Sequence, residues 1–242
     1  MSRRLAVEIA VQDRAGVRVA LEAGADRIEL CSALGVGGLT PSAALIQAAV
    51  EEAASTGRDG FVHVLIRPRA GGFVYDADEV ELAVADIRFA REAGASGVVV
   101  GALDGIGAVD TDAVARFVEA AGDLDVTFHR AIDIVPDPLA ALDALASLGV
   151  RRILTSGGAS RSVDGVGMLA ALSAESAGRV QIMAGGGVSV ADIAAIAVTG
   201  VDAVHLSART TVTGSPSGPG GGDAAYDVTD AAVVREAIAA AG

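Results

Sequence analysis

The strongest constraint in this sequence is a repeated alternation of short β-branched runs with longer segments of helical periodicity. At four places a longer segment closes on a glycine flanked by small or apolar residues, and a β-branched run follows two or three residues later. Glycine after the last helical turn supplies the left-handed C-cap, so each phrase marks the passage from a helix to a strand. The four phrases are Ala23-Gly24-Ala25, Ala93-Gly94-Ala95, Leu148-Gly149-Val150 and Thr199-Gly200-Val201.

The full chain of 242 residues divides into eight such units. Strands are predicted at 5–10, 27–31, 61–67, 96–102, 125–130, 151–156, 179–184 and 203–207. Helices are predicted at 14–24, 41–56, 77–94, 111–121, 137–148, 166–177, 189–199 and 228–240. Eight units with short returns indicate a single-domain α/β protein over residues 1–242, a (β/α)8 or TIM barrel. An open doubly wound sheet is the alternative, but it needs fewer strands and a glycine-rich first turn, which the stretch Val7 to Ala15 lacks.

One low-complexity segment, residues 209–227, lies between the eighth strand and the last helix. Its Gly, Pro and Ser content cannot bury a core, so the segment is predicted to be a flexible insertion. Such a loop is either disordered or a lid over the top of the barrel, and disorder is the favoured state when the site is empty.

Composition excludes several classes of function. A net charge of −13 argues against a nucleic-acid or anionic-membrane partner. All 18 basic residues are arginine, so Schiff-base chemistry is excluded, and an enzyme with this sequence would be a lysine-independent lyase or isomerase. The single cysteine fits a reducing, cytoplasmic setting. Glu8 interrupts the first apolar run, and no apolar run reaches the roughly 18 residues of a membrane span, so neither a signal peptide nor a spanning helix is expected.

Polar side chains late in the strands face the mouth, where TIM barrels build their sites. The stretch Thr127-Phe128-His129-Arg130-Ala131-Ile132-Asp133 concentrates several of them, and its histidine suits proton transfer near neutral pH. Two strands each carry a lone carboxylate, whose pKa burial would raise. The predicted catalytic residues are Glu8, Glu29, His129 and Asp133.

Each of these side chains has a structural alternative. Either strand carboxylate could form an ion pair inside the barrel with Arg67 or Arg27. His129 could be a core histidine that bonds Asp133 or a backbone carbonyl. For His63, which falls midway along its predicted strand, the core interpretation is the better one.

Arginines and glycine turns at the mouth predict an anion site. Two arginines flank Pro68 next to a Gly-Gly turn, where they would bind a carboxylate or phosphate unless they pair with Asp76 or Asp78. A second glycine turn, at 185–187, precedes a helix with Ser189 as its cap, the position of the recurrent phosphate site of barrels. The predicted ligand-binding residues are Arg67, Arg69, Arg130, Ser156, Gly185, Gly186, Ser207 and Arg209.

Cys31, at the end of the second strand, is the only soft metal ligand besides the methionines. Cu(I) prefers thiolate and thioether sulfur and accepts imidazole. A copper site would need His129, His205 or Met183 to converge on Cys31, or Cys31 of a second subunit. The predicted metal ligands are Cys31 and His205, and the alternative is a buried thiol that acts as a small apolar side chain.

Several blocks of this sequence resemble, in order and spacing, the motifs of the CutC copper homeostasis family. The resemblance implies a cytosolic TIM-like barrel that forms a homo-oligomer, is linked to copper tolerance and binds Cu(I). Cys31 would be the anchoring ligand, with His129 or His205 as helpers. The blocks are Gly24-Ala25-Asp26-Arg27-Ile28-Glu29-Leu30-Cys31-Ser32, Gly37-Gly38-Leu39-Thr40-Pro41-Ser42, Ile66-Arg67-Pro68-Arg69, Thr127-Phe128-His129-Arg130-Ala131, Ile153-Leu154-Thr155-Ser156-Gly157 and Met183-Ala184-Gly185-Gly186-Gly187.

Two positions depart from the family pattern. Ala10 stands where the family often has a cysteine, which weakens a two-thiolate copper site. Gly72 stands where an aspartate is common, which removes an acid from that loop.

Two functions therefore follow from the sequence. The first is a CutC-like cytoplasmic protein that binds copper and takes part in copper homeostasis. The alternative is a TIM-barrel enzyme that acts by acid/base chemistry on a small phosphorylated or carboxylated metabolite, since charged groups outnumber soft metal ligands at the mouth. A mainly structural or assembly protein is a third possibility.

Overall fold

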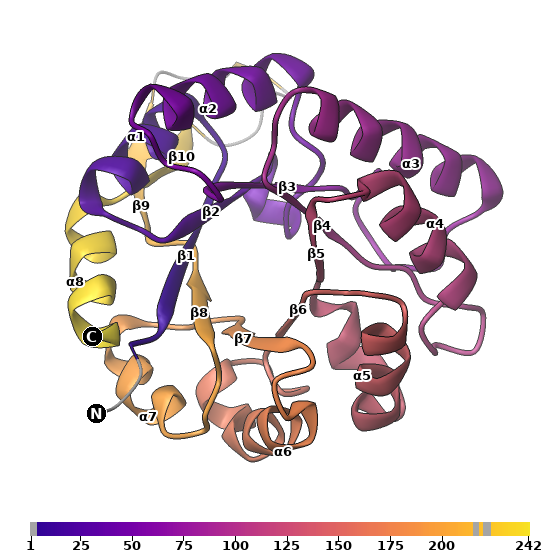
Figure 1. Cartoon of the computed structure of the whole chain (residues 1–242). Coiled ribbons are helices and arrows are strands. Elements are labelled where there is room, and N and C mark those ends of the chain that lie inside the picture. Colours follow the sequence, from indigo (N-terminus) through magenta and orange to yellow (C-terminus); the bar gives the residue numbers. More distant parts are fainter. Residues whose placement is uncertain (1–3, 215–217, 220–223) are drawn as a thin grey trace.

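Eight parallel strands close into a barrel in a computed structural model that describes residues 4–214, 218–219 and 224–242 (Figure 1). Each strand pairs with the next, and β8 pairs back with β1. The prediction of a (β/α)8 barrel is confirmed. The strands are β1 (Ala6–Val11), β2 (Arg27–Leu30), β3 (Val62–Leu65), β4 (Gly97–Val100), β5 (Asp125–Phe128), β6 (Arg152–Thr155), β7 (Gln181–Gly185) and β8 (Ala203–Leu206).

Helices surround the barrel and cover its outer surface (Figure 1). They are α1 (Arg14–Ala23), α2 (Ala43–Ser55), α3 (Ala77–Glu92), α4 (Thr111–Ala121), α5 (Pro138–Ser147), α6 (Val166–Ser176), α7 (Ile193–Ala197) and α8 (Ala231–Ala241). Short 3-10 helices lie in the loops: η1 (Leu34–Val36), η2 (Arg130–Ile134), η3 (Ser162–Gly165) and η4 (Val190–Asp192). None of the helices in the described part of the chain is long and apolar enough to cross a membrane.

Local caps explain why the helices begin and end where they do. Asp13, Ser42 and Asp110 each accept a hydrogen bond from a backbone N–H in the first turn of the helix that follows. Gly24, with a φ of 88°, ends α1 in the left-handed conformation that favours glycine. The predicted boundaries of α1 to α6 therefore differ from the observed ones by at most two residues.

The seventh helix is shorter than the predicted 189–199. The Asp192 side chain accepts bonds from both the backbone and the hydroxyl of Ser189, and this capping box closes the 3-10 turn η4. The α-helix begins only at Ile193 and runs for five residues. Ser189 is a cap as predicted, but of a 3-10 turn.

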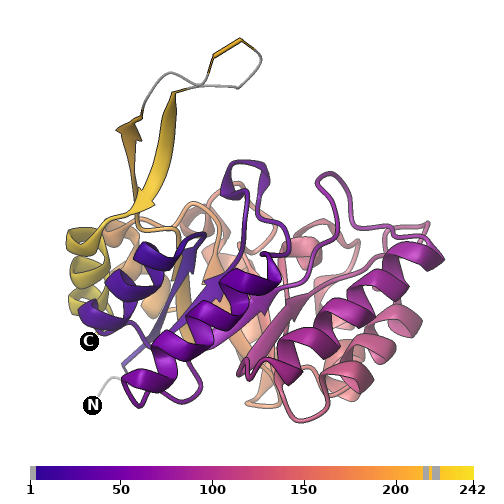
Figure 2. The ribbon, with the colours of Figure 1, turned by 90° about the horizontal axis from the view of Figure 1, so that it is seen from above.

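The insertion at 209–227 is not the structureless loop that its composition predicted. Its ends form an antiparallel pair, β9 (Arg209–Thr213) and β10 (Ala225–Thr229), and the part of the tip at 215–217 and 220–223 lies outside the described residues. β-branched and aromatic residues lie opposite one another on the two strands; Val212, for example, pairs with Tyr226. Such cross-strand pairs stabilise a two-stranded ribbon even when the sequence between the strands is rich in glycine. The described arms rise away from the barrel rather than lying across its mouth (Figure 2).

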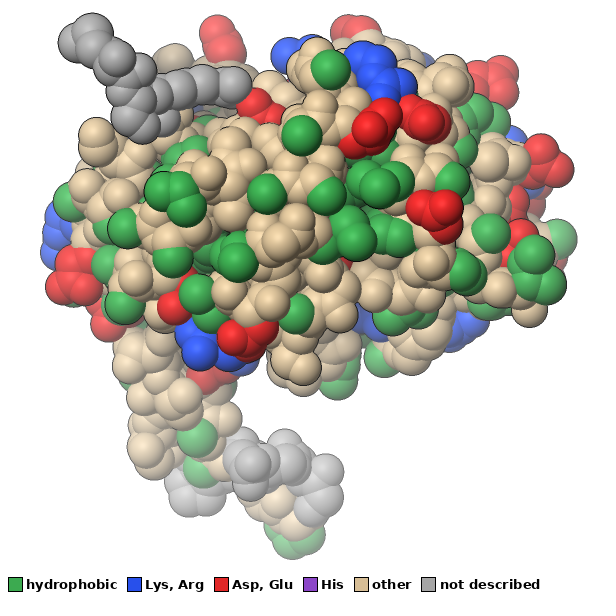
Figure 3. All heavy atoms as spheres, turned by 90° about the horizontal axis from the view of Figure 1, so that it is seen from below, with side chains coloured by type: hydrophobic (Ala, Val, Ile, Leu, Met, Phe, Trp, Pro, Cys, Tyr) green, Lys and Arg blue, Asp and Glu red, His purple; other side chains and the backbone are tan. Residues whose placement is uncertain are grey.

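The barrel interior is charged as well as apolar. Glu8 is fully buried, and its Oε2 lies 2.5 Å from Nε of Arg27, which also donates to the Met183 sulfur at 3.2 Å. Arg27, and not Arg67, is thus the interior partner of Glu8. Between β5 and β6, on the far side of the barrel, buried Arg152 donates to the Thr127 hydroxyl at 3.0 Å. On the outer face shown in Figure 3, acidic and basic side chains are interspersed among apolar side chains and backbone.

Replacement of Arg27 by Met tests how far the barrel depends on its interior ion pair. We expect Arg27→Met to lower the free energy of unfolding by about 3–5 kcal/mol, because Glu8 loses its closest countercharge while remaining buried. The control is Arg4→Met, which removes a surface pair with Asp26 and should cost less than about 1 kcal/mol. Urea unfolding at pH 7 measures both. Equal, small losses would show that His205 alone compensates Glu8.

Candidate functional site

A cavity of about 760 Å³ opens at the carboxyl ends of the strands, a size that suits a small metabolite. Loops after β2, β3, β7 and β8 form its rim, and apolar side chains such as Phe73 and Leu154 form part of its wall. Its ionisable and hydroxyl side chains are Glu29, Arg67, His129, Arg130, Ser189, His205, Ser207 and Arg209.

One wall carries three ionisable side chains from adjacent strands. Nδ1 of His205 on β8 lies 2.8 Å from Oε1 of Glu8 on β1, and Nε2 of the same ring lies 3.7 Å from Oε2 of Glu29 on β2. The strand register brings them together, because Glu8 pairs with His205 across one ladder and Ala10 with Glu29 across the next. Glu29 and His205 line the cavity, whereas Glu8 lies behind them.

The surroundings set the charges of this wall. Burial raises the pKa of Glu29 to about 7 against the pull of His205, and negative Glu8 adds to the rise. Burial also lowers the pKa of His205, but Glu29 and Glu8 outweigh it and leave that pKa above its usual value. Burial would raise the pKa of Glu8, yet Arg27 and His205 hold it far below its usual range. Glu8 stays ionised, and the other two groups can exchange a proton near neutral pH.

The opposite wall carries His129, whose pKa is shifted in the opposite direction to that of His205. His129 follows β5 as the N-cap of η2, and its Nδ1 accepts the backbone N–H of Ala131 at 3.2 Å. Burial, with Arg67 nearby, lowers the pKa of His129 to about 3. These surroundings disfavour the titration near neutral pH that the sequence suggested for this ring. The anticipated bond to Asp133 is also not formed, because the carboxylate turns toward β6.

Asp133 orders a loop rather than lining the cavity. Its Oδ1 accepts from the Thr155 hydroxyl at 2.6 Å and from the Ser156 N–H at 2.9 Å, while Oδ2 lies 2.8 Å from Nε of Arg130. Arg130 also donates to the Ser156 hydroxyl at 3.1 Å. Asp133 and Ser156 therefore hold Arg130 against the cavity from behind.

The two arginines after β3 separate. Arg67 stays in the cavity wall and donates to the carbonyls of Val36, Gly38 and Gly71 at 3.1, 3.0 and 2.7 Å. Arg69 turns outward and pairs with Glu79, a member of the capping box of α3. The sequence correctly anticipated pairing as an alternative, but neither Asp76 nor Asp78 is the partner, and Arg69 does not reach the cavity.

The glycine turn after β7 reaches the cavity in part. Gly185 lies within β7, whereas Gly186 and Gly187 line the cavity. Gly186 has a φ of 121°, and a Cβ there would lie 2.8 Å from the Arg130 guanidinium carbon, so only glycine lets Arg130 lie this close. Ser207 and Arg209 also line the cavity, and Arg209 is paired with Asp227 of the ribbon at 2.8 Å.

Cys31 does not fit a copper site. Its sulfur is fully buried against Leu65 and Val99, donates to the Val11 carbonyl at 3.3 Å and does not line the cavity. Burial, with Glu29 nearby, raises the pKa of the thiol, although a metal ligand must be a thiolate. Met183 does not converge on it, since that sulfur meets Arg27. Among the described residues, no three His, Cys, Asp or Glu side chains are grouped to hold a metal ion.

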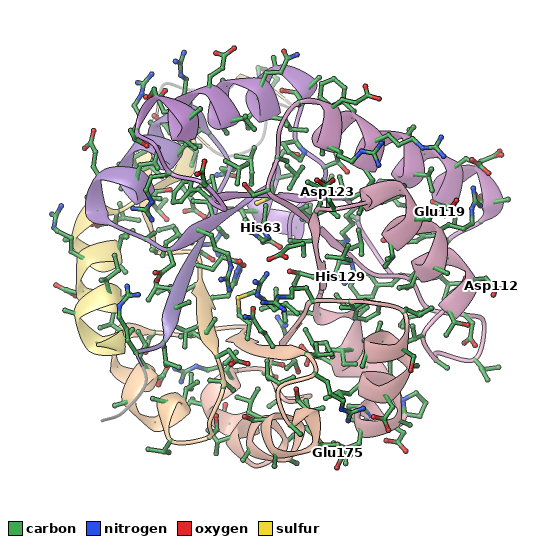
Figure 4. All side chains as sticks on the ribbon, viewed as in Figure 1. His63, Asp112, Glu119, Asp123, His129 and Glu175 are labelled. Atoms are coloured by element: carbon green, nitrogen blue, oxygen red, sulfur yellow. The ribbon has the colours of Figure 1, made fainter. Side chains whose placement is uncertain are left out.

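Sequence reasoning missed the residues that shape the cavity. Phe73 packs on the His129 ring with centroids 4.8 Å apart, and a Cβ at Gly101 would lie 2.3 Å from that ring. Val188 and Val190 line the side near β7. The glycine that follows β4 was the one available signal, since a glycine at a strand end often marks a close approach. Figure 4 shows His63 and His129 inside the ring of strands and Glu119 and Glu175 on the outer helices.

The fold and the cavity define a (β/α)8 barrel with a cavity of mixed polar and apolar lining at the carboxyl ends of its strands. Within that class, the chain belongs to the CutC family, whose sequence profile matches residues 5–210.

Relatives support this assignment over most of the chain. A family protein CutC of Xylella fastidiosa (strain 9a5c) is 42% identical over 245 aligned residues, which cover 98% of this chain and 89% of the relative. One from Agrobacterium fabrum (strain C58) is 43% identical, with coverages of 95% and 91%. A Streptococcus agalactiae crystal structure, provisionally named a copper homeostasis protein CutC, is 32% identical at a TM-score of 0.80 and covers 85% of this chain and 99% of that one. An aldolase structure, QR15, is 14% identical at a TM-score of 0.62 and shares the fold alone.

The opposite pKa shifts of the histidines can be checked directly, because the chain has only three. We expect ¹⁵N-histidine NMR to show His63 and His129 still neutral at pH 5.5, since their pKa values are about 4 and about 3. His205 should stay protonated above the pH of about 6.5 at which free histidine loses its proton. A His205→Asn variant assigns the charged ring. Three rings titrating together near pH 6.5 would contradict these environments.

Proposed function

We propose that this protein is an enzyme that transfers a proton within a small phosphorylated or carboxylated metabolite in the cytoplasm, a lysine-independent lyase or isomerase. The observation that carries the proposal is the Glu29–His205 pair. A carboxyl group with a pKa of about 7 lies 3.7 Å from an imidazole nitrogen at the wall of a metabolite-sized cavity. A general base works best when its pKa lies near the working pH, and burial has moved this glutamate there.

Each remaining polar group has a role in this proposal. Glu8 is a positioning residue, because its bond to Nδ1 of His205 directs Nε2 of that ring toward Glu29 and the cavity. Arg67 and Arg130 supply positive charge for the anionic part of the metabolite. The backbone at Gly186 and the Ser207 hydroxyl complete the anion-binding set.

Copper handling is the second candidate, and the name of the Streptococcus agalactiae structure favours it. In that function Cys31 would be the anchoring Cu(I) ligand, with His205 as its helper. The chemistry of the residues opposes it, because the thiol is buried and outside the cavity, and His205 already faces two carboxylates. We therefore rank it below proton transfer.

A Glu29→Gln variant tests the enzymatic proposal. Wild-type protein is incubated in D₂O with a mixture of phosphorylated and carboxylated metabolites, and ¹H NMR follows deuterium incorporation and new products. We expect Glu29→Gln to lower the rate at least 100-fold, because an amide cannot take up the proton. Glu119→Gln, a change on the outer face of α4, is the matched control. A wild-type rate kept by Glu29→Gln would exclude this carboxylate as the base.

A Cu(I) titration tests the second candidate. Anaerobic competition with a chromogenic chelator compares the wild type with Cys31→Ser and Cys31→Ala. We expect the three proteins to behave alike, because the buried sulfur donates to a carbonyl and does not reach the cavity. Stoichiometric binding by the wild type that both variants lose would place copper on Cys31 and reverse the ranking.

A further inference from the structure

We propose that His129 is a fixed hydrogen-bond donor for a carbonyl oxygen of the substrate. This role narrows the substrate class to small anionic carbonyl compounds with an ionisable C–H next to the carbonyl. The inference rests on the proton transfer proposed above and specifies where it occurs, at carbon. His129 then acts as an electrophile, not as a proton carrier.

The direction of the hydrogen bond follows from the other ring nitrogen. Nδ1 of His129 accepts the backbone N–H of Ala131, so in the neutral ring the proton is on Nε2. Burial together with the nearby Arg67 lowers the pKa of the ring to about 3, which keeps it neutral throughout the physiological range. His129 is therefore a donor at Nε2 and cannot accept there.

This donor has no partner within the described protein. The His129 residue is only 5% exposed and lines the cavity, and its Nε2 is itself buried and makes no hydrogen bond to any described residue. Leaving a buried donor unpaired costs about 1–3 kcal/mol, so such a group points to an acceptor that arrives with a ligand.

The ring is held so that it cannot turn away. It lies against the bare backbone of Gly101, where a Cβ would be 2.3 Å from Cε1 and 2.4 Å from Nδ1. Phe73 packs on the ring, and the hydrogen bond from the Ala131 N–H to Nδ1 fixes the edge of the ring that carries this nitrogen. Held in this way, the donor needs no reorganisation when charge develops on the substrate oxygen.

The charge beside His129 suits an oxygen that becomes negative. The Arg67 guanidinium contacts three backbone carbonyls, and no carboxylate is among the hydrogen-bond or ion-pair partners described for it. By contrast, Asp133 pairs with Arg130 and Asp227 with Arg209. Arg67 is thus the cavity arginine for which the described residues supply no carboxylate. Phe73 lies between it and the donor, since that ring packs on His129 and its centroid lies 5.2 Å from the guanidinium carbon of Arg67.

The base lies across the cavity from this donor. Glu29 and His205 come from β2 and β8, on either side of β1, while His129 follows β5, halfway round the closed barrel. A substrate whose oxygen faces His129 and Arg67 can turn its neighbouring C–H toward Glu29. A neutral imidazole is known to polarise a carbonyl in this way in a barrel enzyme.

The step balances within the substrate and this chain. The Glu29 carboxylate takes the proton from carbon, the C–H electron pair becomes the C=C bond of an enolate, and the carbonyl π pair moves onto oxygen. His129 donates to that oxygen and keeps its proton. Return of the proton from Glu29 to the same carbon restores the carbonyl compound with its hydrogen exchanged, whereas return to another carbon of a conjugated enolate gives an isomer, and no oxidant or reductant takes part.

Oxalate and 2-phosphoglycolate, planar mimics of a carboxylated and a phosphorylated enolate, test the donor. With ¹⁵N-histidine protein, we expect at least one of them to move the His129 Nε2–H resonance downfield. His129→Phe should weaken binding of that mimic at least tenfold, whereas His129→Gln, whose amide can donate, should weaken it less than threefold. Thermal unfolding checks that both variants fold.

The outcomes separate this inference from the proposed function. If neither mimic moves the His129 resonance, or if His129→Gln loses as much affinity as His129→Phe, the donor role is overturned. Glu29→Gln should lose deuterium incorporation and still give the His129 shift. If Glu29→Gln keeps full deuterium incorporation while the shift persists, proton transfer by Glu29 fails and the donor role stands.

Discussion

The buried Glu8 carboxylate is the interaction on which the rest of the site depends. An ionised group with no contact with water must be matched by opposite charge, and Glu8 meets Arg27 on one oxygen and His205 on the other. These two contacts join β1 to β2 through Arg27 and β1 to β8 through His205, and they are consistent with the register of the three strands. The same requirement leaves His205 with one nitrogen engaged and the other directed at Glu29, so a structural necessity also builds a proton-transfer pair.

The pKa values of two histidines in one cavity are thus shifted in opposite directions, and their neighbours decide which. Burial disfavours the charged form of His205, but the neighbouring Glu8 and Glu29 carboxylates favour that form and raise its pKa. His129 has a backbone N–H and an arginine as neighbours, and both disfavour a charge. In the proposed function, the groups that hold and move a proton differ from the group that only donates a hydrogen bond, so an acid/base role and an electrophilic role would not compete for the same proton.

Local signals account for what the sequence could predict. Aspartate and serine caps and left-handed glycines act within one helical turn, so α1 to α6 were found almost to the residue. The predicted third and fifth strands are too long, because Arg67 and His129 continue a β-rich run but leave the ladder to enter the site. The ribbon at 209–229 was missed because its stability comes from cross-strand pairs such as Arg209 with Asp227, which composition does not encode.

The sequence could not predict which of two neighbouring residues faces the cavity, because contacts with residues distant in the sequence decide it. Arg67 and Arg69 are two residues apart and look alike, yet Glu79, ten residues on, removes one of them from the cavity. Cys31 and Glu29 are also two residues apart, and strand alternation alone would place them on the same side. Because β2 ends at Leu30, Cys31 lies outside that alternation, and its thiol packs among Leu65 and Val99 while Glu29 lines the cavity. Which member of such a pair faces a ligand depends on packing against other strands.

The charge of the cavity also differs from that of the chain. A net charge of −13 should repel anions, and two of the three cavity arginines are matched by Asp133 and Asp227. Among the described residues, Arg67 is the cavity arginine that has backbone carbonyls and no carboxylate as its partners, in a wall where low polarisability strengthens its field. In the proposed function, this uneven distribution of charge would orient an anion with its oxygens beside Arg67 and His129. Its carbon skeleton would then face Glu29, whose pKa burial raises to about 7.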